Sequence, residues 1–174
     1  MDAGLVEIEI SIERDHGGRP VIDGFNDTEY CRLSWPRGGG PPFSRGIYLW
    51  MSDDFKVLYV GKATSNQTSH LYRRIAAYKR ATPGKTQRTS LRLNSDILGY
   101  VQGGGRVRLL CLVMPDAAPE DVTRAEETLI DRGRPPWNRQ RNPDPRSVEV
   151  AMSLALLLGL PPSEPLPTSV SIPV

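Results

Sequence analysis

The chain has 174 residues, enough for one domain with a hydrophobic core and too few for two ordinary domains. Its 39% hydrophobic and 24% charged residues are typical of a globular protein, and no stretch approaches the roughly 18 apolar residues of a membrane helix. The acidic start MDAGLVEIEI is unlike a signal peptide, and the distant Cys31 and Cys111 are expected to be buried free thiols. We therefore expect a cytoplasmic protein without membrane contact. Two cysteines and two histidines are too few ligands for a zinc site.

The net charge of +2 conceals an uneven distribution of charge along the chain. Residues 44–140 carry 16 basic and 9 acidic side chains, a net charge of +7, whereas residues 1–43 carry 4 and 8. Between Asp54 and Asp96 there is no acidic residue, and the basic residues there are Lys56, Lys62, Arg73, Arg74, Lys79, Arg80, Lys85, Arg88 and Arg92. This run of basic residues without acidic ones favours a nucleic-acid partner, because each phosphate that it neutralises releases counterions and so strengthens binding. The alternative is a solvated basic face on ordinary helices.

Residues 1–43 are predicted to form an N-terminal extension. Apolar and charged residues alternate over 6–12, which predicts a half-buried strand, and PVIDGF at 20–25 is the candidate return strand after a turn at HGG. WPRGGGPP at 35–42 indicates a loop, because clustered Gly and Pro interrupt both helix and strand. We therefore expect an added β-hairpin and a domain boundary near residue 44.

Residues 44–140 contain the most regular patterns. Strands are predicted at 46–51 and 56–62 around the turn SDDF, followed by helices at 69–80, with Ser69 as its cap, and at 88–101. A buried strand is predicted at 106–114, and then a helix that begins at Pro119 and stops near Gly133. This order indicates an α+β fold, with a small central antiparallel sheet of about three strands flanked by helices.

The last segment, residues 141–174, has an apolar stretch at 148–160 and a proline-rich end. The apolar stretch is expected to be a C-terminal helix that docks on the domain or contacts a partner. The proline-rich end is expected to be extended or disordered.

Four short motifs occur in a fixed order between residues 45 and 138: GIYLW…VLYVGK, LYRRI, AEETLI and PPWN. In this order they resemble the GIY-YIG nuclease family, and the spacing is closest to the nuclease module of the bacterial nucleotide-excision-repair incision protein. The resemblance implies the GIY-YIG fold and a metal-dependent endonuclease that hydrolyses DNA phosphodiester bonds. A site-specific restriction-type enzyme and a repair or weakly specific nuclease both remain open, as does a compact stand-alone member.

The two tyrosines of the first motif are implied to act on the attacking water. Tyr48 would be the general base or orient the water, and Tyr59 would be a second donor to water or phosphate. A phenol has a pKa of about 10, so action as a base near pH 7 requires a shift of about three units, or ~4 kcal/mol. We expect Lys62, on the same sheet face as Tyr59, to supply part of that shift. The alternative is a pair of tyrosines packed across a hairpin.

The resemblance implies three further roles. Glu126, rather than its neighbour Glu127, would bind a single Mg²⁺, or Mn²⁺, since a hard cation with water ligands needs only one carboxylate. Arg74 would bind a phosphate oxygen through its fork of donors, with Arg73 as the competing assignment. Asn138 would brace the site through hydrogen bonds.

DNA contacts are expected from side chains of the basic run and its neighbours. These are Arg73, Tyr78, Lys79, Arg80, Lys85, Arg88 and Arg92. One site cuts one strand, so double-strand cleavage needs either two encounters or a homodimer formed through the N-terminal or C-terminal extension. The alternative function is a non-catalytic or structure-specific nucleic-acid-binding module.

Overall fold

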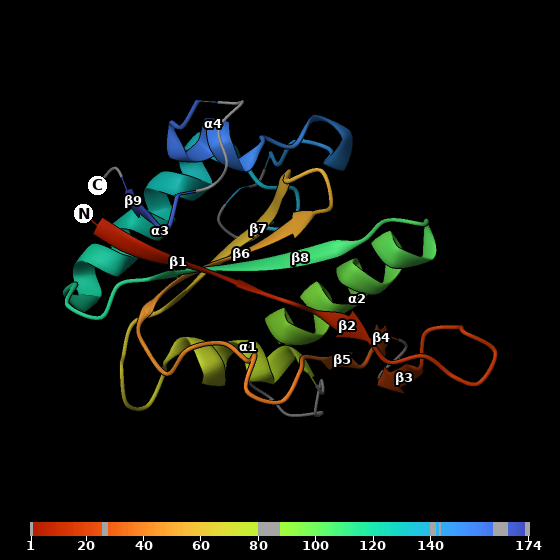
Figure 1. Ribbon diagram of the computed structural model, residues 1–174. Helices are drawn as coiled ribbons and strands as arrows, with labels where there is room; N and C mark the ends of the chain where they lie inside the picture. Colours follow the sequence, from red (N-terminus) through yellow and green to blue (C-terminus); the bar gives the residue numbers. More distant parts are fainter. Residues whose placement is uncertain are drawn as a thin grey trace.

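A computed structural model describes residues 2–25, 28–79, 88–139, 142, 144–161 and 167–172. Its centre is a five-stranded antiparallel sheet with the strand order β7-β6-β8-β1-β9 (Figure 1). The strands are β1 (Asp2–Ile8), β6 (Gly46–Ser52), β7 (Val57–Ala63), β8 (Val107–Val113) and β9 (Ser169–Ser171). Two small pairs lie outside it, β2 (Ser11–Ile12) with β5 (Leu33–Ser34) and β3 (Ile22–Phe25) with β4 (Thr28–Cys31).

Strand β6 is buried on both faces, because alternate side chains of a strand point to opposite sides. Ile47, Leu49 and Met51 enter one hydrophobic core cluster, and Tyr48 and Trp50 enter another. All five are 0% exposed. The predicted strands at 46–51, 56–62 and 106–114 are confirmed as three neighbouring strands of the sheet, with β7 at its edge.

Helices cover both faces of the sheet (Figure 1). They are α1 (Leu71–Lys79) and α2 (Arg88–Gln102) on the Tyr48 face, and α3 (Pro119–Gly133) and α4 (Leu154–Leu158) on the Ile47 face. Helix α3 begins at Pro119 as predicted, since proline lacks the N–H that the first turn cannot satisfy. It ends where Arg134 adopts a left-handed conformation, φ 45°, and its N–H donates to the Ile130 carbonyl at 2.7 Å.

Helix α1 is capped by His70, not by Ser69 as the sequence predicted. The Nδ1 atom of His70 accepts from the backbone N–H of Arg73 at 3.2 Å, and its carbonyl accepts from Arg74 at 3.0 Å. A neutral imidazole has one nitrogen that can accept a hydrogen bond, so it can do what a serine hydroxyl does at this position.

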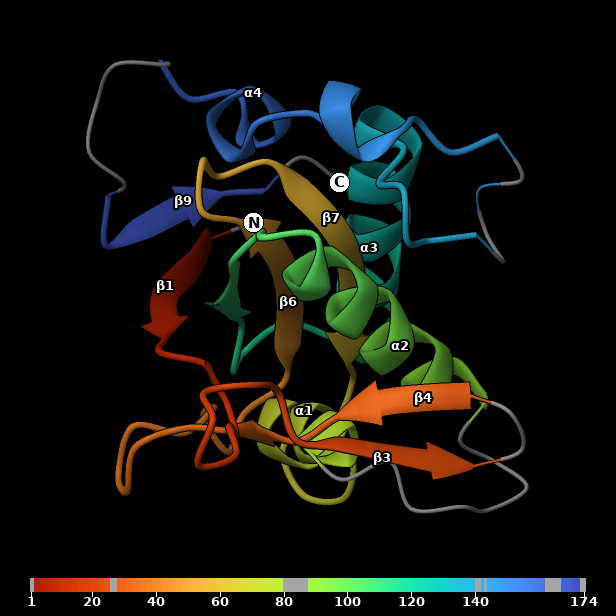
Figure 2. The same cartoon turned by 90° about the vertical axis from the view of Figure 1, so that its right-hand side faces the viewer.

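The N-terminal extension is part of the sheet, which corrects two expectations. The β1 strand pairs with β8 and β9, so the described sheet has five strands rather than about three. The chain does reverse at HGG as predicted, where Arg14 and Pro20 form an antiparallel bridge. Beyond that turn, β3 does not pair with β1 but with β4, which runs alongside α2 (Figure 2). Alternation of apolar and polar residues identifies a strand, but it does not identify the strand's partner.

The C-terminal segment also docks on the sheet. The apolar stretch forms a 3₁₀ turn, η1 (Val148–Val150), and the short helix α4. Leu154 and Leu157 of α4 pack with α3 in the hydrophobic core cluster that contains Ile47. Part of the proline-rich end is extended, as β9 pairs with the start of β1. Within the described ranges, no helix has the length and apolar character needed to cross a membrane.

Candidate active site

The mirrored triplets GIY and YVG face each other across the β6–β7 pair. Tyr48 pairs with Gly61, and Trp50 pairs with Tyr59. A Cβ atom on Gly61 would overlap the ring of Tyr48, so glycine makes room for the phenol on the neighbouring strand. The glycine of the YVG triplet is thus required sterically by the tyrosine of the GIY triplet on the neighbouring strand.

Glycine is also required at Gly46, at the start of β6. Its φ of 154° favours glycine, and a Cβ there would collide with the carbonyl oxygen of Leu112 on β8. The close approach of β6 to β8 therefore depends on this residue, and it fixes the strand that carries Tyr48.

Three phenols form a cluster between the sheet and α1. The hydroxyls of Tyr48 and Tyr78 are hydrogen-bonded at 2.6 Å, and the Tyr48 ring lies 6.1 Å from the ring of Tyr59. The exposed fractions are 0% for Tyr48, 1% for Tyr78 and 7% for Tyr59. Tyr59 is therefore the phenol with the most access to solvent.

The pKa values of these phenols move opposite to the expected direction. Burial raises the pKa of Tyr48 well above its ordinary value of 10.0, and burial likewise raises the pKa values of Tyr59 and Tyr78. Lys62 does not lie on the face of Tyr59, since the two are three residues apart on one strand. At neutral pH the cluster therefore holds neutral phenols.

Arg74 of α1 lies beside the phenol cluster, and it is exposed to solvent. Its pKa is raised above the ordinary value, first by the nearby phenol of Tyr48 and also by those of Tyr78 and Tyr59. A guanidinium in this position is accessible to an anion while it interacts electrostatically with the three phenols, most strongly with Tyr48. It is thus placed to bind a phosphate oxygen.

Lys62 and Glu126 form an ion pair around the β7 edge of the sheet. The Nζ atom of Lys62 lies 2.8 Å from Oε2 of Glu126, whose exposed fraction is 7%. The adjacent Glu127 is exposed, so of the two candidate carboxylates Glu126 is the one that faces the protein. The charge of Glu126 also reaches Tyr59, where it adds to the effect of burial in raising the pKa. The carboxylate therefore acts electrostatically on Tyr59 across the β7 edge.

Asn138 pairs with the outer edge of β7. Its Oδ1 accepts from the N–H of Val60 at 2.8 Å, and its Nδ2 donates to the Val60 carbonyl at 2.7 Å. The preceding Trp137 donates its N–H to the Leu58 carbonyl at 2.9 Å. These bonds flank Tyr59 on both sides, so they hold its backbone in place.

Of the expected DNA-contacting residues, the structure describes the side chains of Arg73, Tyr78 and Arg92, and these differ in their exposure. Tyr78, expected at the DNA surface, is instead buried in the phenol cluster, because it falls on the apolar face of α1 with Ile75. Arg92 is held by the Trp137 carbonyl at 3.0 Å, whereas Arg73 is exposed. Arg80 and Lys85 lie outside the described residues, as do the side chains of Lys79 and Arg88.

The donor atoms of the site fit one hard divalent cation. Among the residues that the structure describes, no group of three or more His, Cys, Asp or Glu side chains could hold a metal ion. A single Mg²⁺ needs only Glu126, because water and phosphate oxygens can complete its coordination shell. Lys62 occupies Oε2 of that carboxylate, so a bound cation would share Glu126 with the ammonium or displace it.

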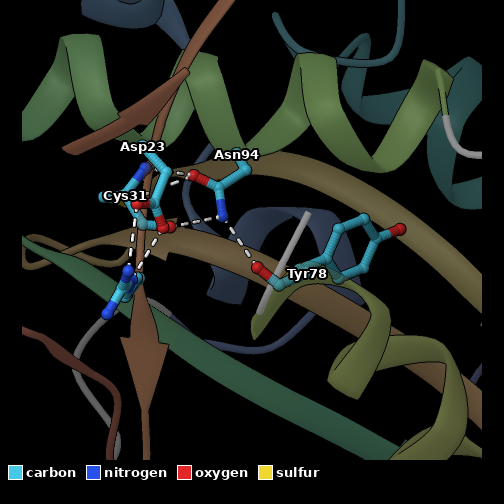
Figure 3. A network of polar contacts seen from close by, with 5 residues as sticks. Asp23, Cys31, Tyr78 and Asn94 are labelled. Carbon is cyan, nitrogen blue, oxygen red and sulfur yellow. Dashed lines mark hydrogen bonds and ion pairs between the residues drawn. The ribbon is translucent and has the colours of Figure 1, made fainter. Parts of the chain in front are cut away.

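Asn94 is a residue of the site region that motif reasoning missed. It lies on α2, and its amide bonds both the N–H and the carbonyl of Cys31 on β4 at 2.8 Å. Its Nδ2 also donates to the carbonyl of Tyr78 at 2.7 Å (Figure 3). The one signal in the sequence is that Asn94 is a polar residue on the apolar face of a predicted helix, beside Leu93 and Ile97.

Comparison with models of known protein families, with curated proteins and with solved structures found no match for this chain.

Proposed function

We propose that this protein is a metal-dependent endonuclease of the GIY-YIG type that hydrolyses phosphodiester bonds in DNA. The observation that carries the proposal is the meeting of three phenols, the Arg74 guanidinium and the Lys62–Glu126 pair around β7. In this proposal β6, β7 and β8 with α1, α2 and α3 form the GIY-YIG fold, and β1 and β9 widen its sheet.

Cleavage of a phosphodiester bond requires an oriented water, neutralisation of charge that develops on the phosphate, and help for the departing oxygen. Arg74 supplies the neutralising donors, since its guanidinium is exposed on one side and faces the phenols on the other. Lys62 supplies a second cation, which is held by Glu126 until a phosphate approaches.

Glu126 is the residue that would hold a Mg²⁺ ion. When bound, such an ion neutralises phosphate charge and lowers the pKa of a water molecule. Because burial makes Glu126 a fixed carboxylate, it can position that charge without moving.

Tyr59 is the phenol that contacts the attacking water in this proposal. Its hydroxyl is neutral, so it orients the water and accepts a proton from it while passing its own hydroxyl proton to a phosphate oxygen, and no tyrosinate is needed. Tyr48 is fully buried against Tyr78, so its role is to position Arg74 and Tyr59. This assignment reverses the order of the two tyrosines expected from the motif.

Nicking of supercoiled plasmid in Mg²⁺ tests the proposal. Glu126→Gln is expected to lower the rate by roughly a hundredfold or more, because it removes the charge that holds the cation. Glu127→Gln is the matched control, with the same change one residue away on the exposed face of α3, and it should keep full activity.

The competing function is a DNA-binding module without catalysis, and the Lys62–Glu126 pair favours it, because the ammonium occupies the carboxylate. A wild-type protein that binds DNA but never cuts it in Mg²⁺ or Mn²⁺ would support that alternative. Full activity of Glu126→Gln would show that the assigned site is wrong.

A further inference from the structure

A group of aromatic side chains lies at the start of α1, outside the phenol cluster. Phe43 is stacked on Tyr72, with ring centroids 4.5 Å apart and an angle of 14° between the planes. The His70 ring is 4.9 Å from Phe43, and Trp35 meets Tyr72 edge-on at 6.1 Å. We call these four residues the aromatic platform.

Phe43 is the outermost ring of the platform, and it is 70% exposed. Tyr72 covers one of its faces, so most of the exposed area belongs to the other face. An exposed phenylalanine ring does not contribute the free energy that burial of its apolar surface would give. A large exposed ring is therefore a candidate contact surface.

The platform is held rigidly by the backbone. The carbonyls of Pro42 and Ser44, on either side of Phe43, accept hydrogen bonds from the first N–H groups of α1, at 3.0 Å from Tyr72 and 2.8 Å from Leu71. These bonds satisfy helix donors that have no partner within the helix. Phe43 is thus presented to solvent by a loop that is already ordered, so a ligand that stacks on it need not order that loop.

The charge around the platform suits a phosphate backbone. Residues 30–52 and 55–95 contain no acidic residue, and exposed arginines lie close in sequence to two of the platform residues. Arg73 follows Tyr72 in α1, and Arg37 lies on the loop after Trp35. An aromatic face with nearby cations is the arrangement by which proteins bind unpaired bases, because every base has a π face to stack.

We propose that the aromatic platform stacks an unpaired base of the DNA substrate, so that the protein prefers DNA with a single-stranded segment beside the scissile bond. The inference rests on the proposed nuclease function. Tyr72 and Arg74 lie on opposite flanks of α1, whose width with side chains is about 10 Å. The stacked base would therefore lie a few nucleotides from the phosphate bound by Arg74.

The test measures binding separately from cleavage. The probe is a duplex with a single-stranded overhang that carries the fluorescent base 2-aminopurine, titrated with the full-length protein without divalent cations. Stacking quenches this fluorophore, so wild-type protein should quench it. Phe43→Ala and Phe43→Leu should lose the quenching and weaken overhang binding roughly tenfold. Phe43→Trp should retain both.

Three controls separate stacking from other effects. Phe43→Leu keeps apolar bulk without a π face, and Leu156→Ala alters an exposed apolar residue on α4, which should change nothing. A blunt duplex of equal length should bind wild type and Phe43→Ala alike, because its bases are already stacked.

The possible results are distinct. Three results would each contradict the platform proposal. Phe43→Leu could keep wild-type affinity and quenching, or the Phe43 variants could bind blunt and overhang DNA equally weakly. The wild-type protein could also fail to bind the overhang, which would indicate another partner for the exposed ring. Plasmid nicking in Mg²⁺ reports separately on the nuclease. Quenching that depends on Phe43, without any cutting, would support the platform proposal and contradict the nuclease proposal. Cutting without such quenching would support the nuclease proposal and contradict the platform proposal.

Discussion

Tyr48 and Tyr59 stand on adjacent strands of one hairpin, but they differ in their access to solvent. Tyr48 is fully enclosed and bonded to Tyr78, whereas Tyr59 keeps 7% of its surface exposed at the edge strand. Burial raises both pKa values above the ordinary value, so neither phenol ionises near neutral pH. In the proposed mechanism, access therefore decides which of them contacts the attacking water.

The first prediction compares the two phenols. We expect Tyr59→Phe to lower plasmid nicking about a hundredfold, in the range of a lost proton-transfer group, and Tyr48→Phe to lower it about tenfold or less. Because burial holds the pKa of Tyr59 above its ordinary value, the loss in Tyr59→Phe should not vary across the neutral pH range. A larger loss in Tyr48→Phe, measured under the same conditions, would restore Tyr48 as the residue that contacts water.

Strand β7 is the element on which the site depends, and it is an edge strand. An edge leaves a row of backbone groups without a neighbouring strand. Trp137 and Asn138 bond backbone groups of this row at Leu58 and Val60, so two residues of the segment after α3 extend the sheet at this edge. The prolines that precede Trp137 turn the chain back from α3 toward this edge.

The second prediction concerns this edge. We expect Asn138→Ala to lower the free energy of unfolding by about 2–4 kcal/mol, because two buried backbone groups lose their partners. Asn138→Asp should be no more stable than Asn138→Ala, since a carboxylate oxygen would face the Val60 carbonyl in place of a donor. Urea unfolding monitored by circular dichroism measures both. Wild-type stability of Asn138→Ala would show that water replaces the amide at no cost.

At the scale of the whole molecule, the chain before residue 44 packs into the same sheet as the part that follows it. Strand β1 occupies the sheet position next to β8, and Asn94 ties β4 to α2 and to the end of α1. The predicted boundary near residue 44 therefore marks a change of composition but no break in packing. The Tyr78 hydroxyl in the phenol cluster depends on the same junction.

The third prediction tests this junction. Asn94→Leu keeps the side-chain size but leaves three buried backbone groups on Cys31 and Tyr78 unpaired, so we expect a loss of about 3 kcal/mol or more in the free energy of unfolding. Cys31→Ala is the matched control, because the backbone bonds remain and only a thiol is lost; it should cost about 1 kcal/mol. Equal losses in denaturant unfolding would show that packing, not the amide, holds the junction.

The sequence by itself determined the type and order of the central elements. Turn chemistry located β6 and β7, the apolar run at 106–114 located β8, and Pro119 began α3, because each of these signals acts within a few residues. The expectation that Lys62 shares a sheet face with Tyr59 was wrong, because residues three apart on a strand point to opposite faces.

Only the tertiary structure decided the rest. The pairing of β1 with β8, the bond between Tyr48 and Tyr78, and the attachment of Asn138 to Val60 join residues that are distant in the chain. Desolvation of the phenols depends on all the elements that enclose them, so the direction of their pKa shifts could not be derived from neighbours in sequence. Local chemistry sets the elements, whereas burial and long-range contacts set what their side chains can do.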